Sequence, residues 1–233
     1  MKTGIVCIAT GKPYHWYARN LHASVRRYVP HAEFILFSDM GGNPGVEKYF
    51  EISPKGYPDE TLYRYHTMIK QMDVLLEYDQ IFYCDADMQF VSYPDLHYVD
   101  GLVATRHPGF FFNNQRGTPE TRRQSKAFCN YNDVYYCGGF QGGETKHYLT
   151  AAGIMSSRIS ADHLNGITAV WHDESHWNKY LTDIPPRRVL SPRYCFPEDY
   201  DGGYGWSADE YPPILVAMDK RKRGNHPRFP DAS

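Results

Sequence analysis

The stretch Gly4-Ile5-Val6-Cys7-Ile8-Ala9 opens the part of the chain that decides the fold. It is short, apolar and rich in β-branched residues, which predicts a buried strand over residues 4–9. Apolar residues at helical spacing follow and predict a helix over residues 14–29, which Pro30 ends. A second apolar run predicts another strand over residues 33–37. The order strand, helix, strand favours an α/β sheet.

The rest of the chain continues this alternation without a low-complexity tract or an internal repeat. We expect one short strand in the Gly- and Pro-rich loop of residues 41–57. The other expected strands cover residues 81–83, 101–105, 134–140 and 189–190. The expected helices cover residues 61–76, 144–160 and 174–181. No boundary in this pattern demands two domains, so we predict one domain over residues 1–233.

Composition limits the classes of function. The 233 residues carry 25 basic and 27 acidic side chains, a net charge of −2 that gives no reason to expect binding to nucleic acid or an anionic membrane. Aromatic residues make up 15% of the chain, with 20 Tyr, which suits a carbohydrate or nucleotide pocket but also a Tyr-rich core. Five scattered Cys without CxxC spacing indicate reduced thiols rather than zinc or a disulfide framework. No apolar run reaches membrane-spanning length, so we expect a soluble protein without a membrane anchor.

Two acidic clusters carry the chemistry. Asp85-Ala86-Asp87 follows the predicted strand 81–83, and carboxylates at a strand end hold a divalent cation against phosphate oxygens or merely cap a turn. The segment Trp171–Tyr180 places Asp173 and Glu174 among aromatic side chains, which suits sugar binding and acid–base or nucleophilic work. Together the clusters point to a glycosyltransferase that uses a sugar nucleotide.

The chain resembles glycosyltransferase family 6, the family of the blood group A and B transferases and the α1,3-galactosyltransferases. The motifs that carry the resemblance are Tyr83-Cys84-Asp85-Ala86-Asp87-Met88, Arg106-His107-Pro108-Gly109-Phe110, Tyr135-Tyr136-Cys137-Gly138-Gly139-Phe140, Trp171-His172-Asp173-Glu174-Ser175-His176 and Leu190-Ser191-Pro192 with Tyr194. The resemblance implies a single GT-A-type domain with a mixed central sheet flanked by helices. It also implies a UDP-sugar donor, a galactose-terminated glycan acceptor, a retained anomeric configuration in an α1,3 linkage, and Mn²⁺ with Mg²⁺ as the alternative.

The same resemblance implies roles for the acidic residues. Asp85 and Asp87 would hold the metal, and Asp173 would bind hydroxyls of the donor sugar. Glu174 would be the catalytic carboxylate, either as a nucleophile or as the stabiliser of an oxocarbenium-like ion. The structural alternatives are an N-cap for Asp173 and a favourable helix-dipole position for Glu174.

The donor site implied by the resemblance draws on several segments. Beyond the acidic residues, it contains Ile8, Ala9, Thr10, Tyr14, Arg64, Ala86, Cys137, Gly138, Gly139 and Lys220. Tyr14 would stack on uracil, and Lys220, within a basic run, would neutralise the diphosphate. Cys137 and Gly139 match the positions that set donor choice, and the small Gly139 predicts UDP-GalNAc over UDP-Gal.

On the acceptor side, the resemblance implies His107 as a hydrogen-bonding partner and Trp171 as a stacking face beside Glu174. Glu198 and Asp199 are the nearest acidic residues at the place where blood group enzymes have one that binds the acceptor, so the acceptor pocket differs.

The length resembles the small bacterial or viral members, which predicts a cytoplasmic location in a bacterium or virus-infected cell. Residues 219–233 are predicted to form a mobile tail. The rival functions are a sugar-nucleotide or glycan-binding protein and a UDP-sugar hydrolase.

Overall fold

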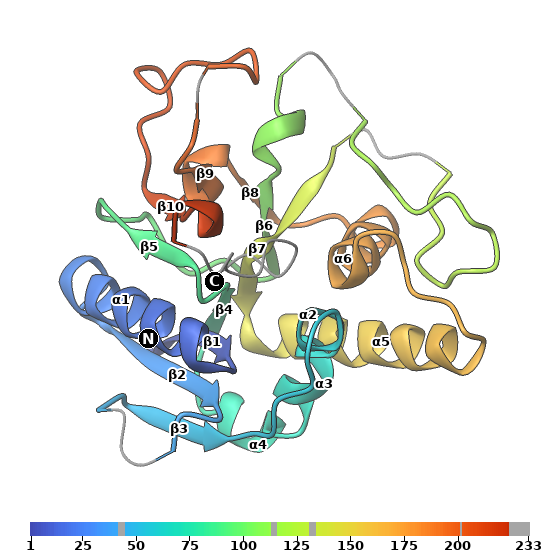
Figure 1. Ribbon diagram of the computed structural model, residues 1–233, viewed down its shortest axis with the longest axis horizontal. Helices are drawn as coiled ribbons and strands as arrows, with labels where there is room; N and C mark the ends of the chain where they lie inside the picture. The colour runs from blue at the N-terminus through green and yellow to red at the C-terminus, as the bar shows by residue number, and fades with distance from the viewer. Residues whose placement is uncertain (42–44, 113–115, 131–133, 201, 224–233) are drawn as a thin grey trace.

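The computed structural model describes residues 1–41, 45–112, 116–130, 134–200 and 202–223, which form two sheets and several helices (Figure 1). The larger sheet has the spatial order β3 (Lys48–Glu51), β2 (Ala32–Ser38), β1 (Thr3–Ala9), β4 (Gln80–Cys84), β7 (Tyr136–Glu144), β6 (Leu102–Arg106) and β8 (Arg188–Leu190). The smaller sheet has the order β5 (Met88–Phe90), β10 (Leu215–Ala217) and β9 (Phe196–Pro197). The prediction of an α/β fold with a mixed central sheet is confirmed.

One reversed strand makes the larger sheet mixed. β1 runs parallel to β2 and β4, whereas β7 runs antiparallel to both β4 and β6. The carboxyl ends of β1, β4 and β6 therefore share one edge of the sheet with the amino end of β7. Ligands of open α/β sheets bind at the carboxyl ends of the parallel strands, where the strand order reverses.

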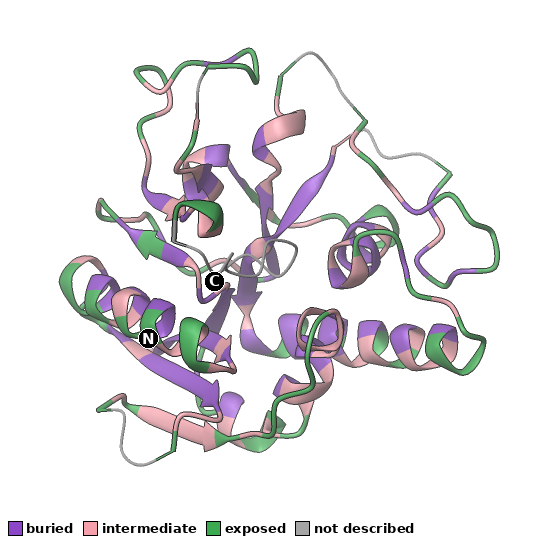
Figure 2. Ribbon diagram, viewed as in Figure 1, coloured by how far each residue is buried: buried purple, intermediate pink, exposed green. Residues whose placement is uncertain are grey.

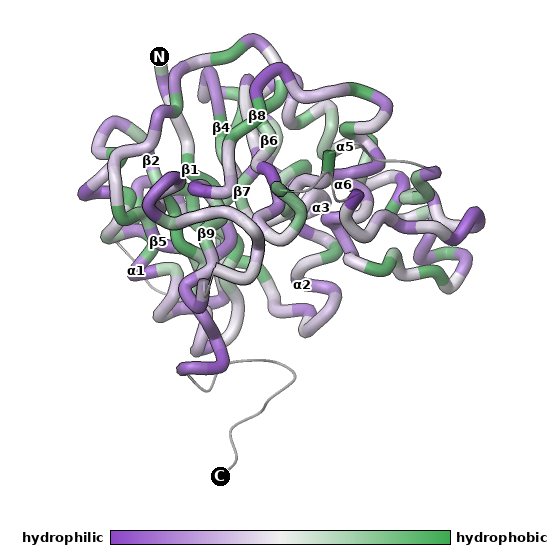
Figure 3. Tube along the Cα trace, turned by 90° about the horizontal axis from the view of Figure 1, so that it is seen from above, coloured by the Kyte–Doolittle hydropathy of each residue, from purple (hydrophilic) through white to green (hydrophobic). Residues whose placement is uncertain are grey.

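Helices cover both faces of the sheet. Helix α1 (Lys12–Tyr28) packs on one face, and helices α3 (Arg64–Ile69), α5 (Thr145–Leu164) and α6 (His172–Asp183) lie on the other. Because successive strand residues point to opposite faces, Ile5 and Cys7 of β1 join the core under α1 while Val6 joins the core under α5. The central strands β1, β2 and β4 are accordingly buried, whereas the edge strand β3 is only partly buried (Figure 2). Hydrophobic residues follow the central strands through the interior (Figure 3). None of the helices in the described ranges is long and apolar enough to cross a membrane.

The predicted helix over residues 61–76 is wrong in one respect, because it is broken into α2 (Asp59–Leu62), α3 and α4 (Met72–Leu75). The backbone leaves helical geometry at Tyr63 (φ −95°, ψ 15°) and at Gln71 (φ −117°, ψ 28°). Met72, at the start of α4, is 41% exposed. The first break turns Arg64 inward, which matters for the site described below.

Strand β7 is longer than predicted because it continues through Gly142 and Gly143. A Cβ atom at Gly142 would lie 2.2 Å from the carbonyl oxygen of Ile81 in β4. Gly143 has a φ of +122°, and a Cβ there would lie 2.2 Å from the carbonyl oxygen of Gly101. These two glycines therefore allow close packing of neighbouring strands.

The other predicted elements appear with shifted ends. The strands expected at 4–9, 33–37, 81–83, 101–105 and 189–190, the strand within 41–57, and the helices at 14–29, 144–160 and 174–181 are confirmed. Lys220–Arg223 form a short 3₁₀ helix, η3. Residues 224–233 lie outside the described residues. The extent of the domain and of the predicted tail therefore stay predictions.

Candidate functional site

The predicted donor residues lie where strands β1, β4 and β7 meet. Val6 of β1 is in register with Tyr83 of β4, so residues 8–10 and the acidic turn of residues 85–87 extend from adjacent strand ends. The backbone N–H of Asp85 donates to the carbonyl oxygen of Gly139 at 2.9 Å, which brings the start of β7 to the same place. The mixed topology therefore gathers segments that are far apart in sequence.

The side chain of Arg64, from helix α3, contacts several of these segments. Its side chain is buried, and Nη1 donates to the carbonyl oxygen of Gly138 at 2.9 Å and lies 3.2 Å from Oδ1 of Asp85. Its Nε lies 3.0 Å from Oδ2 of Asp173. Burial of a guanidinium is costly unless it is paired, and here two carboxylates and a carbonyl surround it. Four of the predicted donor residues, Arg64, Asp85, Gly138 and Asp173, are thus in direct contact.

The two carboxyl groups in the first turn of α6, Asp173 and Glu174, have raised pKa values. Burial raises the pKa of Asp173 to about 8, although the nearby Arg64 opposes this rise. Burial likewise raises the pKa of Glu174 to about 7, although a hydrogen bond from the Gly138 N–H at 2.8 Å opposes it. Oδ2 of Asp173 is buried, and the guanidinium of Arg64 lies 3.0 Å from it. Perturbed carboxylates in one place are typical of a functional site.

The acidic pair at the end of β4 offers hard oxygen ligands. Lys220 of η3 places Nζ 2.7 Å from Oδ2 of Asp87 and 5.7 Å from the ring centre of Tyr14. The carboxylate of Asp87 is thus paired with a cationic side chain. The side chain of Asp85 is 33% exposed and accepts from the Tyr83 hydroxyl at 2.8 Å. This donor set fits a metal such as Mn²⁺ or Mg²⁺.

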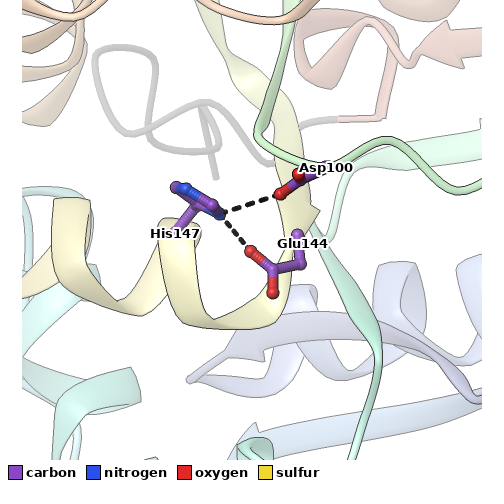
Figure 4. Close-up of side chains that lie close together, drawn as sticks. All are labelled: Asp100, Glu144 and His147. Atoms are coloured by element: carbon purple, nitrogen blue, oxygen red, sulfur yellow. Dashed lines mark hydrogen bonds and ion pairs between the residues drawn. The ribbon is translucent and has the colours of Figure 1, made fainter.

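Another group of metal-ligating side chains lies at the opposite edge of the sheet. Asp100, Glu144 and His147 offer ligand atoms within 4.8 Å of one another (Figure 4). Glu144 is in register with Gln80 at the start of β4, whereas Asp85 follows the end of that strand. This group is therefore separate from the predicted donor site and supplies no ligand to it.

The predicted acceptor residues differ in burial and in their hydrogen bonds to neighbouring residues. His107 follows β6, and its Nδ1 accepts a hydrogen bond from the Gly109 N–H at 3.1 Å. Burial lowers the pKa of His107 to about 4, so the imidazole is neutral near pH 7. Trp171 precedes α6 with its side chain 42% exposed. Glu198 accepts from the Asp219 N–H at 2.6 Å, so it is engaged with the C-terminal segment.

Tyr135 is a site residue that the sequence analysis missed. Its buried ring packs against His107 at a centroid distance of 5.7 Å, and its hydroxyl hydrogen-bonds Glu174 and lowers the pKa of that carboxyl. Tyr83 was also missed. It lies two residues before Asp85, and residues two apart along a strand point to the same face, which would have indicated it. Tyr135 carried no such signal, because its partner Glu174 lies 39 residues away in sequence. It joins His107 to Glu174.

Replacing Tyr135 by Phe is expected to shift the pH dependence of turnover. Loss of the hydroxyl removes a hydrogen bond that keeps the pKa of Glu174 near 7. That pKa should rise by roughly half a pH unit to one pH unit, since such a bond contributes about 1 kcal/mol. If Glu174 acts as a carboxylate, the acid limb of the kcat profile moves to higher pH by the same amount. Tyr17→Phe, which removes a buried hydroxyl without a partner among the described residues, should leave the profile unchanged. An unshifted acid limb in Tyr135→Phe would contradict this role.

Comparisons with known proteins agree on one family. The family model described as Glycosyltransferase family 6 matches residues 53–208. Histo-blood group ABO system transferase 2 of Rattus norvegicus is 40% identical over 131 residues, or 54% of this chain and 39% of that protein. Globoside alpha-1,3-N-acetylgalactosaminyltransferase 1 of Homo sapiens is 28% identical over 83% of this chain and 60% of that protein. O-antigen biosynthesis glycosyltransferase WbnI of Escherichia coli is 29% identical over 86% of this chain and 90% of that protein. The chain thus spans well under half of the rat relative's length.

Proposed function

The chain belongs to glycosyltransferase family 6, and on this premise we propose that it is a retaining α1,3-glycosyltransferase. It transfers GalNAc or Gal from a UDP-sugar to a galactose-containing glycan acceptor, with a divalent metal, Mn²⁺ or Mg²⁺, as cofactor. The reaction replaces the bond between the anomeric carbon and the diphosphate with a bond to an acceptor hydroxyl oxygen. UDP is the leaving group, and the proton of the hydroxyl passes to the leaving diphosphate.

The observation that carries this proposal is the position of Glu174. On one side, Gly138 and the Arg64 network connect it to the acidic turn at the end of β4. On the other side, Tyr135 connects it to His107. A buried carboxylate between a cation-binding pair and a neutral hydrogen-bonding ring suits the anomeric carbon of a donor sugar.

Each residue then has a distinct task. Asp173 and Arg64, which are paired with each other beside Glu174, hold donor hydroxyls. A metal held by Asp85 and Asp87 would offset the charge of the leaving diphosphate. Glu174 either attacks the anomeric carbon or stabilises the oxocarbenium-like ion while the acceptor attacks from the same face, and both routes retain configuration. The neutral His107 orients the acceptor hydroxyl by hydrogen bonding.

The direct test is incubation with UDP-GalNAc or UDP-Gal, Mn²⁺ and a β-galactoside, with the product linkage determined by NMR. An α1,3-linked product supports the proposal. UDP release that is independent of the galactoside would instead indicate a hydrolase. Binding of the donor without UDP release would indicate a sugar-nucleotide-binding protein.

Donor choice is expected to depend on Gly139. We predict a preference for UDP-GalNAc, because the absence of a side chain at Gly139 leaves room for an N-acetyl group. That room is narrow, since a methyl group there would lie 3.2 Å from Oδ2 of Asp85 and 3.3 Å from Sδ of Met88. Gly139→Ala should shift the ratio of kcat/KM values toward UDP-Gal by about 1–3 kcal/mol, the worth of one methyl-sized clash.

The control for Gly139→Ala is the Mn²⁺ concentration that gives half-maximal activity. Because the new methyl group also touches Asp85, an altered metal requirement would mean that the substitution acts through the acidic pair. The claim that space at Gly139 sets donor choice would be refuted in two cases. One is a ratio of kcat/KM values for the two donors that stays the same in Gly139→Ala. The other is a wild-type preference for UDP-Gal. Kinetics with both donors decide between these outcomes.

A further inference from the structure

Three side chains at the edge of the sheet opposite the proposed active site have the geometry of metal ligands (Figure 4). Asp100 precedes β6, Glu144 ends β7, and His147 lies in the first turn of α5. Nδ1 of His147 lies 3.9 Å from Oδ1 of Asp100 and is hydrogen-bonded to Oε2 of Glu144. Two donors bound to one Zn²⁺ at about 2.0–2.2 Å lie about 3.3–3.6 Å apart in a tetrahedral arrangement. Small rotations of these side chains therefore bring all three donor atoms onto one ion.

The backbone holds the three ligands together without an ion. The N–H of Glu144 donates to the carbonyl oxygen of Gly101 at 3.0 Å, which ties the loop that carries Asp100 to the end of β7. Glu144 is also in register with Gln80 of β4. The side chain of Glu144 is only 17% exposed, whereas those of Asp100 and His147 are 82% and 55% exposed. Glu144 is thus the fixed ligand, and the other two are free to adjust.

The charge of this group favours a cation. Among the described residues, neither Asp100 nor Glu144 is ion-paired with a Lys or an Arg, and the only ion-pair partner of each is His147. Lys146 and Arg187 line the adjoining cavity but are not paired with either carboxylate. The amino end of α5 contributes only about half a positive charge, which two carboxylates outweigh. A divalent ion would offset both carboxylates at once.

A cavity adjoins the three ligands and gives an ion access from solvent. Its volume is about 660 Å³, and it is lined by all three ligands and by residues 184–187, which follow α6. A neighbouring cavity of about 580 Å³ shares Glu144 and has Thr145 in its wall. Thr145 is 1% exposed, and its Oγ1 has no hydrogen-bond partner among the described residues. Burial of an unpaired hydroxyl is costly, and a water or ligand oxygen beside it would offset that cost.

The types of donor atom select the metal. An imidazole nitrogen together with carboxylate oxygens suits Zn²⁺, and a site of nitrogen and oxygen donors binds Zn²⁺ more tightly than Mn²⁺. The acidic turn of residues 85–87, in contrast, offers carboxylate oxygens alone, which suit Mn²⁺ or Mg²⁺.

We propose that Asp100, Glu144 and His147 form a second metal site, which binds Zn²⁺ and is separate from the proposed catalytic metal. Three protein ligands leave the fourth tetrahedral position to a water that faces the cavity. The ion would join the start of β6, the end of β7 and the start of α5, so its role is structural. This inference does not depend on the proposed function.

The test is calorimetric titration of the metal-free protein with Zn²⁺. The wild type should bind Zn²⁺ at this site, and His147→Ala should lower the affinity by more than the ~10–100-fold that loss of a group supporting a metal ligand costs. His163→Ala is the matched control, because His163 is exposed near the other end of the same helix, and it should bind Zn²⁺ like the wild type. The same loss should appear when Asp87→Asn is the parent protein, since that substitution weakens the proposed catalytic site.

Two further measurements identify the site and the state of the variants. X-ray absorption of the Zn²⁺ complex in Asp87→Asn should show nitrogen and oxygen ligands at about 2.0–2.2 Å and no sulfur at about 2.3 Å. Because an ion that binds only the native state stabilises it, Zn²⁺ should raise the Tm of the wild type and of Glu174→Gln but not that of His147→Ala. Metal-free His147→Ala should unfold cooperatively, which shows that it is folded.

The proposal is overturned if His147→Ala binds Zn²⁺ as tightly as its parent, if the parent binds no Zn²⁺, or if sulfur ligands appear. None of these readouts uses sugar transfer. A protein that binds Zn²⁺ as described but transfers no sugar would keep this site and lose the proposed function, and the reverse result would do the opposite.

Discussion

Replacing Glu174 by Gln is expected to reduce kcat on the order of 10²–10³-fold, the usual loss when a group that stabilises developing charge is removed. Gln has the same shape, and its carbonyl oxygen can still accept the hydrogen bond from the Gly138 N–H. The fold and UDP binding should therefore persist. Because the carboxylate acts on positive charge in the transition state, kcat should fall more than KM rises.

The measurement is steady-state kinetics with donor and acceptor varied, combined with calorimetric titration of UDP. Glu144→Gln is the matched control, because Glu144 lies at the opposite edge of the sheet and should keep full kcat. A folded Glu174→Gln variant with near-normal kcat would remove this residue from the chemistry, whichever of the two retaining routes operates.

Metal removal is expected to have the other large effect. EDTA should abolish transfer, and Mn²⁺ should restore it, because the acidic pair at the end of β4 fits a divalent ion. Asp87→Asn should weaken Mn²⁺ binding by more than the ~10–100-fold that loss of a group supporting a metal ligand costs. The substitution also removes the ion-pair partner of Lys220, which lies 2.7 Å from Asp87.

Titration of Mn²⁺ by calorimetry or by water-proton relaxation gives this affinity independently of turnover. Asp100→Asn is the control, because it alters the other group of metal-ligating side chains and should leave the Mn²⁺ requirement of transfer unchanged. Full activity of the unaltered protein in chelator would contradict the proposed metal site. So would a metal requirement that is lost in Asp100→Asn but kept in Asp87→Asn.

The sequence predicted those parts of the site that depend on local order. The acidic turn comes directly after a buried strand, and Asp173 and Glu174 lie in the first turn of a helix, as their patterns indicated. The break of the helix at Tyr63 was not predictable, because no Gly or Pro marks it. Helical propensity is a weak prior, and here the burial of Arg64 between two carboxylates accompanies the break.

Long-range partners were also beyond the sequence patterns. The hydrogen bond of Tyr135 to Glu174 and the hydrogen bond of the Trp206 Nε1–H to the Pro108 carbonyl oxygen join residues from different elements. Their positions follow from the way the chain folds back on itself, which has no local signature. The family resemblance supplied Arg64, His107 and Lys220, which composition and periodicity alone did not single out.

The single guanidinium of Arg64 has a thermodynamic consequence. Because it is shared between Asp85 and Asp173, a ligand that changes the charge at one carboxylate changes the field felt by the other. If Asp85 holds the proposed metal and Asp173 the donor sugar, metal affinity and donor-sugar affinity are linked. By reciprocity, the factor by which the cation changes sugar binding then equals the factor by which the sugar changes cation binding. The complete donor would therefore change the affinity for the cation by a factor that UDP alone, which lacks the sugar, does not contribute.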